Sequence, residues 1–121
     1  MAYNILICDD SVAMRQMVKM ILMAYNYGIN EANDGLEALE LTKQYQFDLI
    51  ITDVNMPKMD GLSLVRQLRT LPDYQFTPIL LATTEPDGKI KKAAKAAGAT
   101  GWIIKPFEPD RLVAAVKKVL R

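Results

Sequence analysis

The fold of this chain follows from the stretch Leu49-Ile50-Ile51-Thr52-Asp53-Val54-Asn55-Met56-Pro57-Lys58-Met59-Asp60-Gly61. It begins with a short apolar run that has no polar alternation, which is typical of a parallel strand buried on both faces. The proline and glycine that follow prevent the strand from continuing. Asp53 therefore sits at the carboxyl end of a buried strand, the edge at which open α/β sheets place their chemistry.

Polar side chains stand at the ends of three further predicted strands. Asp9 and Asp10 follow one of them, Thr83 closes another and Lys105 closes a third. Three carboxylates in one crevice repel each other and serve stability poorly. The arrangement makes sense if a cation and a phosphoryl group lie between them, with Lys105 paired to one phosphoryl oxygen and Thr83 hydrogen-bonded to another. Such a site works by positioning and electrostatics, without a general base.

The order of elements along the chain is a repeated strand and helix. Ser11 is a plausible helix N-cap, Gly98 a helix-ending glycine, and Pro109 suits a first helical turn. The alternation predicts an α/β fold, a doubly wound five-stranded parallel sheet with five helices. The expected strands are residues 4–8, 29–32, 49–52, 78–82 and 101–104. The expected helices run over 11–25, from the turn at 33–35 through 41, from 62 to near 72, over 87–97, and from 109 to near the end.

Composition sets the broad class. The chain has 121 residues, of which 50% are hydrophobic, so we expect a single domain over residues 1–121 with its own core. Its one cysteine, Cys8, lies in a predicted buried strand and reads as a packed core thiol. The absence of histidine excludes histidine-based catalysis and histidine-ligated zinc. With no visible signal peptide and no apolar run of membrane-spanning length, we expect a cytoplasmic protein that does not enter a membrane.

The charge is distributed unevenly along the chain. Residues 1–60 carry nine acidic and four basic residues, net −5, whereas residues 61–121 carry five acidic and eleven basic residues, net +6. Two interpretations are open: ordinary solvated helix faces, or a basic docking face for an acidic partner segment. We expect no nucleic-acid binding, because the basic cluster lacks a reader motif. The cluster consists of Lys89, Lys91, Lys92 and Lys95, with Lys117, Lys118 and Arg121 near the C-terminus.

Four motifs occur together in this chain. They are Asp9-Asp10, Asp53 placed thirty residues before Thr83 and fifty-two before Lys105, the turn Met56-Pro57-x-Met59-Asp60-Gly61, and Lys105-Pro106-Phe107. With these motifs the chain resembles response-regulator receiver domains, and among them the stand-alone chemotaxis regulators of the CheY type. The resemblance covers essentially the whole chain. It implies a flavodoxin-like sheet with strand order 2-1-3-4-5.

The resemblance also implies a function in a two-component system. A sensor histidine kinase would transfer a phosphoryl group to Asp53 in the presence of one Mg²⁺. Asp10 and Asp53 would bind the metal directly, Asp9 more naturally through water, and Asn55 through its backbone carbonyl. Thr83 and Trp102 would act as the switch that changes the face formed by the fourth helix, fifth strand and fifth helix. The Lys105-Pro106 turn is a candidate cis peptide.

Two residues depart from the usual pattern of the resembled family. Trp102, three residues before Lys105, stands where the family usually has tyrosine or phenylalanine. Its ring is larger, and it can donate a hydrogen bond but not accept one. Thr84 stands where alanine or glycine is usual, so we expect narrower access to Asp53. Asn55 and Glu85 are of the types found in chemotaxis regulators and favour that function.

The expected partners follow from the same resemblance. They are a kinase as phosphodonor, a downstream protein target for which the flagellar motor switch is a candidate, and a phosphatase as a further candidate. We expect a monomer that is a signalling protein and not an enzyme. One alternative is a single-domain phosphorelay intermediate. A more distant one is an aspartate-nucleophile phosphohydrolase of the haloacid-dehalogenase type, which needs an acid two residues after the nucleophile, where this chain has Asn55.

Overall fold

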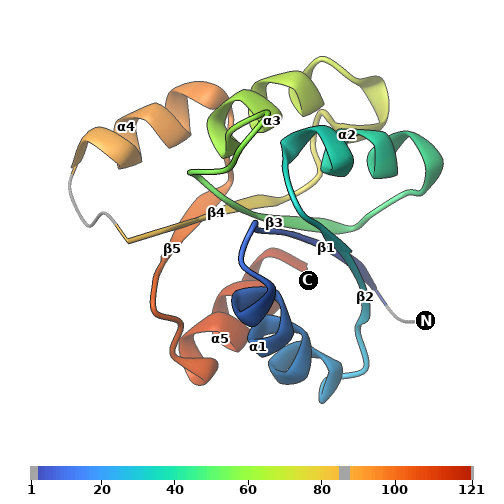
Figure 1. Cartoon of the computed structure of the whole chain (residues 1–121), viewed down its shortest axis with the longest axis vertical. Coiled ribbons are helices and arrows are strands. Elements are labelled where there is room, and N and C mark those ends of the chain that lie inside the picture. Colours follow the sequence, from blue (N-terminus) through green and yellow to red (C-terminus); the bar gives the residue numbers. More distant parts are fainter. Residues whose placement is uncertain (1–2, 85–87, 121) are drawn as a thin grey trace.

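The computed structural model describes residues 3–84 and 88–120. Within them, five strands form one parallel sheet, and α1 and α5 cover one face while α2, α3 and α4 cover the other (Figure 1). The doubly wound topology expected from the sequence is confirmed. The strands are β1 (Asn4–Cys8), β2 (Gly28–Ala32), β3 (Leu49–Asp53), β4 (Ile79–Thr83) and β5 (Gly101–Ile104), arranged in the order β2-β1-β3-β4-β5.

The helices connect successive strands. They are α1 (Val12–Met23), α2 (Gly35–Gln44), α3 (Gly61–Arg69), α4 (Gly88–Ala97) and α5 (Pro109–Leu120), with a short 3₁₀ turn, η1 (Pro72–Tyr74), after α3. The third helix ends at Arg69, earlier than the expected end near Pro72, because Thr70 caps it and η1 takes up the chain. The expected start of the fourth helix at Asp87 lies outside the described residues. No helix among the described residues is both long and apolar enough to cross a membrane.

The strands are apolar on both faces because both faces are covered. In β1, Ile5 and Ile7 pack toward α1 and α5, whereas Leu6 and Cys8 pack toward α2 and α3. Successive side chains of a strand point to opposite faces, so an uninterrupted apolar run contributes to two separate cores. Cys8 is buried, and burial raises the pKa of its thiol to about 12, which keeps it protonated as a core residue.

Short-range hydrogen bonds set the helix boundaries. Ser11 caps α1 by accepting a hydrogen bond from the Met14 amide at 3.2 Å, as the sequence predicted. At the C-terminal end of α4, Gly98 has φ +102°, and the Ala99 amide donates to the Ala94 carbonyl at 3.0 Å. This left-handed helix ending needs a residue without a Cβ atom. Pro109 begins α5, as expected.

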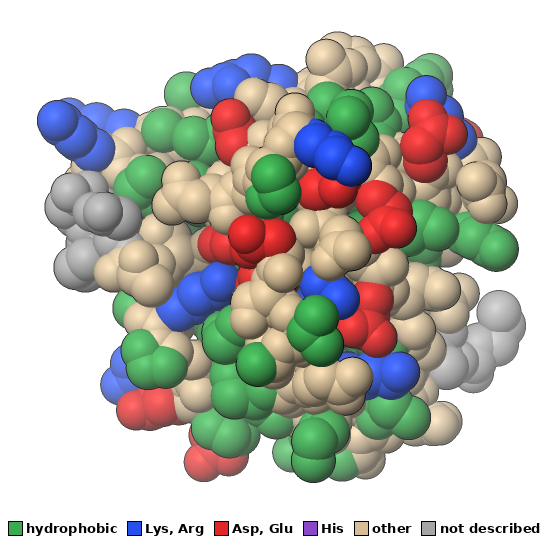
Figure 2. Space-filling model, viewed as in Figure 1, with side chains coloured by type: hydrophobic (Ala, Val, Ile, Leu, Met, Phe, Trp, Pro, Cys, Tyr) green, Lys and Arg blue, Asp and Glu red, His purple; other side chains and the backbone are tan. Residues whose placement is uncertain are grey.

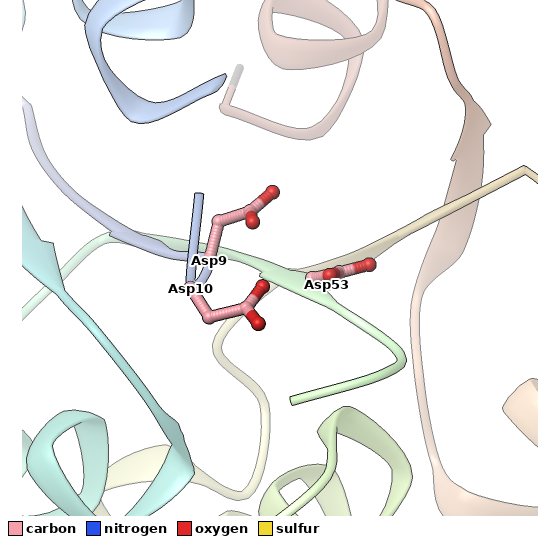
Figure 3. Close-up of side chains that lie close together, drawn as sticks. All are labelled: Asp9, Asp10 and Asp53. Atoms are coloured by element: carbon pink, nitrogen blue, oxygen red, sulfur yellow. The ribbon is translucent and has the colours of Figure 1, made fainter. Parts of the chain in front are cut away.

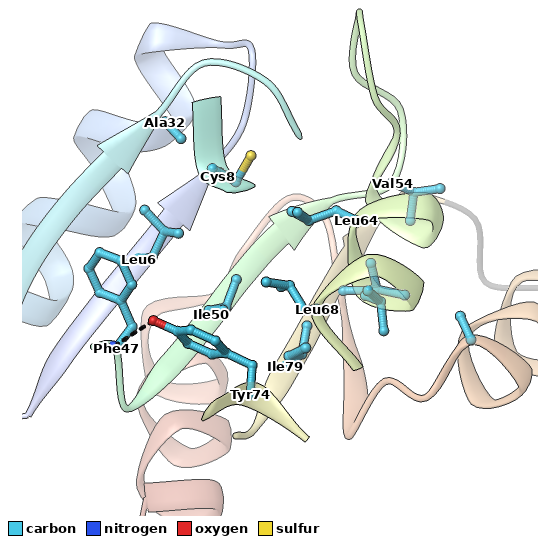
Figure 4. Packing of buried hydrophobic residues seen from close by; sticks show 14 of the residues in the cluster. Leu6, Cys8, Ala32, Phe47, Ile50, Val54, Leu64, Leu68, Tyr74 and Ile79 are labelled. Carbon is cyan, nitrogen blue, oxygen red and sulfur yellow. Dashed lines mark hydrogen bonds between the residues drawn. The ribbon is translucent and has the colours of Figure 1, made fainter. Parts of the chain in front are cut away.

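The end of the sheet away from the strand carboxyl ends is closed by Tyr74 (Figure 4). Its ring is 1% exposed, its hydroxyl donates to the Tyr45 carbonyl at 2.6 Å, and it accepts from the Phe47 amide at 3.2 Å. Arg69 binds the neighbouring loops through the carbonyls of Tyr74 and Thr77, each at 2.7 Å, and of Gly98 at 2.9 Å. These hydrogen bonds fix the loops at this end of the sheet, and the polar side chains of the site lie at the opposite end.

Two strands extend one residue beyond their expected carboxyl ends, while β2 begins one residue earlier than expected, at Gly28, and β4 one residue later, at Ile79. Asp53 and Thr83 are the last residues of β3 and β4, because the pairing of Asp53 with Ala82 and of Thr83 with Ile104 continues the ladders to that point. The loop after β3 then turns tightly: the Gly61 amide donates to the Val54 carbonyl at 2.8 Å. A Cβ at Gly61 would lie 2.1 Å from the Asp53 carbonyl oxygen. Only glycine allows α3 to begin this close to Asp53.

Replacing Gly61 by alanine should therefore destabilise the fold and displace Asp53. The new Cβ meets backbone, which cannot swing away, so we expect a loss of about 1–3 kcal/mol in the free energy of unfolding. The matched control is Gly88→Ala, because a Cβ there meets nothing within 4 Å. Urea unfolding should show the control within about 0.5 kcal/mol of wild type. Equal stability of the two variants would contradict the close approach of α3 to Asp53.

Candidate functional site

Three carboxylates converge at the carboxyl edge of the sheet. Asp9 and Asp10 follow β1, Asp53 ends β3, and one oxygen of each lies within 4.8 Å of the others (Figure 3). Asp9 is buried, Asp53 is partly buried and Asp10 is exposed. Figure 2 shows acidic side chains gathered across the middle of this face, between the two helical layers, with basic side chains beside them. The strand order brings together carboxylates that are 43 or more residues apart in the sequence.

Lys105 crosses this group from the end of β5. Its Nζ lies 2.8 Å from Asp9 Oδ2 and 3.2 Å from Asp53 Oδ1. The lysine side chain is 12% exposed, so both ion pairs are largely shielded from solvent. The peptide bond between Lys105 and Pro106 is cis. Lys105 thereby joins the ends of three strands through one ammonium group.

The electrostatics of Asp53 differ from those of an ordinary surface carboxylate. Its pKa is raised above the usual range because burial disfavours the charged form and Asp9 repels it, and these effects outweigh the attraction of Lys105 and the hydrogen bond from the Val54 amide. For Lys105, burial alone would lower the pKa, but the hydrogen bond and charge of Asp9, followed by those of Asp53, raise it. Lys105 therefore stays charged, while Asp53 is held as an anion at a cost.

The remaining predicted residues lie around this centre. Thr83 ends β4 and is 3% exposed, next to Lys105, whose amide donates to the Thr83 carbonyl at 2.8 Å. Asn55 and Thr84 are exposed in the loops after β3 and β4. Glu85 lies outside the described residues. The structure thus places Thr83, Lys105 and the acidic residues at the ends of adjoining strands, where the sequence pattern predicted them.

Trp102 lies on β5, away from the carboxylates. It is 40% exposed, as is Ile104 on the same face of the strand, and Lys91 of α4 stands over the indole ring at 5.2 Å. Two grooves, of about 460 and 390 Å³, run beside Trp102 between β5 and α5. Lys117 stands over the ring of Tyr25 at 4.7 Å. The basic residues near Trp102 therefore include Lys91 and, in the second groove, Lys118.

Arg15 is a residue of the site that sequence reasoning missed. It lies on α1, and its guanidinium donates to the Asp9 carbonyl, to Asn33 Oδ1 at 2.9 Å and to Glu31 Oε1 at 3.1 Å. One signal was available in the sequence: a cation close to the start of a helix is disfavoured by the helix dipole and therefore suggests a specific contact.

The donor set suits a hard divalent cation. Three carboxylates offer oxygen ligands only, and the one that is exposed, Asp10, keeps the group open to water. Mg²⁺ is bound in proteins by one or two carboxylates together with water and phosphate oxygens. A cation here would also offset the mutual repulsion of the three carboxylates. The residues present therefore fit Mg²⁺.

An open parallel sheet with this strand order and this acidic edge defines the receiver class of signalling domains. Residues 5–117 match the family model described as the response regulator receiver domain, and the chain belongs to that family. It is therefore the receiver domain of a two-component response regulator, a signalling protein whose family implies a kinase as phosphodonor.

The proteins that this chain is similar to include transcriptional regulators and a chemotaxis regulator. The chain is 36% identical over 118 residues to the transcriptional regulatory protein ResD of Bacillus subtilis, and 30% identical over 120 residues to the probable transcriptional regulator ycf29 of Porphyra purpurea. These alignments cover 98% and 99% of the chain but 48% and 57% of the relatives, so the chain spans about half of their length. The chemotaxis response regulator CheY4 of Vibrio cholerae is 44% identical, with a TM-score of 0.95, and the match covers 99% of this chain and 100% of that one.

The raised pKa of Asp53 predicts how stability depends on pH. A carboxyl whose pKa is higher in the folded than in the unfolded protein costs stability above the folded pKa, and this cost disappears as the pH falls through that value to the ordinary carboxyl range. Without metal, Asp53→Asn should therefore raise the melting temperature at neutral pH. The advantage should shrink in acid.

Asp10→Asn is the matched control for this prediction. Asp10 belongs to the same cluster but is exposed, so its removal should raise the melting temperature less than that of Asp53. Thermal unfolding in a chelating buffer from neutral to acidic pH measures both variants. A larger gain from Asp10→Asn, or a gain from Asp53→Asn that grows in acid, would contradict the assigned electrostatics.

Proposed function

We propose that this domain accepts a phosphoryl group on Asp53 from a histidine of a sensor kinase, with Mg²⁺ bound at the acidic cluster, and that phosphorylation makes it bind a protein target in chemotaxis. The observation that carries the proposal is the contact of one lysine with Asp9 and Asp53 at 2.8 and 3.2 Å, beside a third carboxylate. No purely structural role requires three carboxylates at this edge.

The geometry supports a direct displacement at phosphorus. One carboxylate oxygen of Asp53 would attack the phosphorus atom of phosphohistidine, the phosphorus–nitrogen bond would break, and the kinase imidazole would leave with the bonding electron pair. Repulsion between the carboxylate and the anionic phosphoryl oxygens opposes this approach. Mg²⁺, held by Asp9, Asp10, Asp53 and the backbone carbonyl of Asn55, would supply positive charge that reduces the repulsion.

The residues of this chain would then stabilise the product. Lys105 would pair with a phosphoryl oxygen as a point charge, and the Thr83 hydroxyl would donate to another. Thr83 ends β4, the strand that pairs with β5. A change at its side chain would therefore reach the strand that carries Trp102. The switch is thus a population shift between two packings, biased by one hydrogen bond and one charge pair. Trp102 either moves toward the space beside Thr83 or stays outside while the backbone shifts.

Two targets are consistent with the relatives. Similarity to a chemotaxis regulator that the chain matches over 100% of its length favours a protein target, with the flagellar motor switch as the candidate. The transcriptional regulators, of which the chain matches about half, favour a role that ends in gene control. The expectation of no nucleic-acid binding stays a prediction. So do the expected monomer and a single domain over residues 1–121.

The phosphoacceptor is tested by labelling. Acetyl phosphate or a cognate kinase with Mg²⁺ should add one phosphoryl group per chain, and Asp53→Asn should abolish the labelling. Of the two carboxylates that pair with Lys105 in the described residues, Asp53 has the more exposed side chain, at 13% against 6% for Asp9. Asp60→Asn, in the loop after β3, is the control and should label like wild type. Stoichiometric labelling of Asp53→Asn at another residue would overturn the assignment. Rapid transfer from labelled Asp53 to a second histidine protein would instead favour the relay alternative.

The output face is tested through Trp102, the only tryptophan of the chain. Beryllofluoride with Mg²⁺, a mimic of the phosphoryl group, should change its fluorescence. Trp102→Ala should weaken target binding by about 10-fold, as loss of a central aromatic at an interface does, while phosphorylation is nearly unchanged. Tyr45→Ala removes another exposed aromatic and is the control. Target binding that depends on Tyr45 and not on Trp102 would place the output face elsewhere.

A further inference from the structure

Arg15 is a largely buried cation whose position on α1 has no local explanation. Its side chain is 12% exposed, although arginine is rarely buried in proteins unless it is paired. It is the fourth residue of α1, near the helix end at which a positive charge is unfavourable. Neither solvation nor helix stability therefore accounts for an arginine here, and its contacts must do so.

The guanidinium connects three segments of the chain. One nitrogen, Nη1, donates to the carbonyl oxygen of Asp9 at 2.5 Å and to Asn33 Oδ1 at 2.9 Å. Nε donates to Glu31 Oε1 at 3.1 Å. The other oxygen of Glu31 pairs with Lys19 at 3.6 Å, so the Glu31 carboxylate is held between two cations. The forked donor geometry of arginine suits this set of acceptors in a way that a lysine ammonium does not.

The contact with the Asp9 carbonyl completes the restraint of that residue. The Asp9 amide donates to the Ala32 carbonyl at 3.1 Å. Its Oδ1 accepts from the Ser11 amide at 2.9 Å, and its Oδ2 accepts from Lys105 at 2.8 Å. With Arg15 bound to its carbonyl oxygen, every polar group of Asp9 has a partner.

The same contact fixes Asp10. The carbonyl of Asp9 belongs to the planar peptide that joins it to Asp10, so holding the oxygen sets the plane from which Asp10 continues. Asp10 itself is exposed, and its carboxylate points into the group that it forms with Asp53 (Figure 3). A carboxylate on an exposed residue is preorganised only if the backbone that carries it is fixed.

We infer that Arg15 is a positioning residue of the acidic cluster, which holds the Asp9–Asp10 peptide so that the Asp10 carboxylate is oriented for a divalent cation. This inference rests on the proposed function, because it assumes that the cluster binds Mg²⁺. Partners of metal ligands typically change metal affinity 10–100-fold when they are removed. Arg15 acts here on the backbone of a ligand and does not contact the cation.

The competing explanation is that Arg15 only anchors α1 to β2 through Glu31. Lys19 separates the two roles, because it is on the same helix and pairs with the same carboxylate but does not reach Asp9. Lys19→Met removes a cation from the anchor and leaves the Asp9 carbonyl contact intact. Arg15→Met removes both a cation that pairs with Glu31 and the contact with the Asp9 carbonyl. Arg15→Gln is a second variant: it keeps a polar side chain of good helix propensity, but one too short to hold the Asp9 carbonyl and Glu31 together.

The experiment measures the Mg²⁺ dissociation constant of each purified, folded variant by calorimetric titration. Urea unfolding in chelating buffer runs in parallel. We expect Arg15→Met and Arg15→Gln to bind Mg²⁺ about 10-fold more weakly than wild type. Lys19→Met should stay within about twofold, whatever small stability loss it shows. The inference is supported if Mg²⁺ affinity falls in the variants that lose the Asp9 carbonyl contact, whatever their free energy of unfolding.

Wild-type affinity in either folded Arg15 variant overturns the inference and leaves the proposed function standing. A loss in Lys19→Met equal to that in Arg15→Gln also overturns it, because the anchor to β2 would then explain the effect. Failure of the wild-type protein to bind Mg²⁺ is a separate result. It would contradict the proposed function itself.

Discussion

The structure depends on the pairing of Lys105 with Asp9 and Asp53. One ammonium lies 2.8 and 3.2 Å from carboxylates on two other strands, in a place where the lysine side chain is 12% exposed. Without it, the buried Asp9 and the partly buried Asp53 would face each other as anions with no compensating charge, an arrangement that proteins avoid. With it, the cluster still carries more negative than positive charge. That excess is the property on which cation and phosphoryl binding depend.

The fold creates this excess of negative charge because the carboxyl ends of the strands meet at one edge of the sheet. Parallel strands joined by crossover helices all end at one edge, so residues from three strands meet there although they are far apart in sequence. Gly61 lets α3 begin against Asp53, and Arg15 holds the backbone at the end of β1. The opposite end of the sheet is closed by Tyr74 and Arg69, with every hydrogen-bonding group of the tyrosine satisfied. The end of the sheet with these hydrogen bonds thus lies opposite the end that carries the destabilising charge cluster.

Most of the fold and the centre of the site could be predicted from the sequence because both depend on local pattern. Apolar runs interrupted by Pro and Gly mark the strands, and Asp53 and Lys105 stand where those runs end. What could not be predicted depends on contacts between distant segments. Strand pairing extended β3 and β4 to Asp53 and Thr83, and side-chain reach placed Lys91 over Trp102 and Lys117 over Tyr25. Arg15 was missed because its acceptors come from segments that only the fold brings together.

The mechanism depends on the charge of Asp53, which is kept as an anion against burial and a neighbouring like charge until a cation joins the cluster. It is tested most directly by following the side-chain carboxyl carbon of Asp53 by NMR through a pH titration, in chelating buffer and again with Mg²⁺. The metal-free pKa of Asp53 should lie above the ordinary aspartate range, and Mg²⁺ should lower it. A metal-free pKa at or below the ordinary range, unchanged by Mg²⁺, would contradict this mechanism.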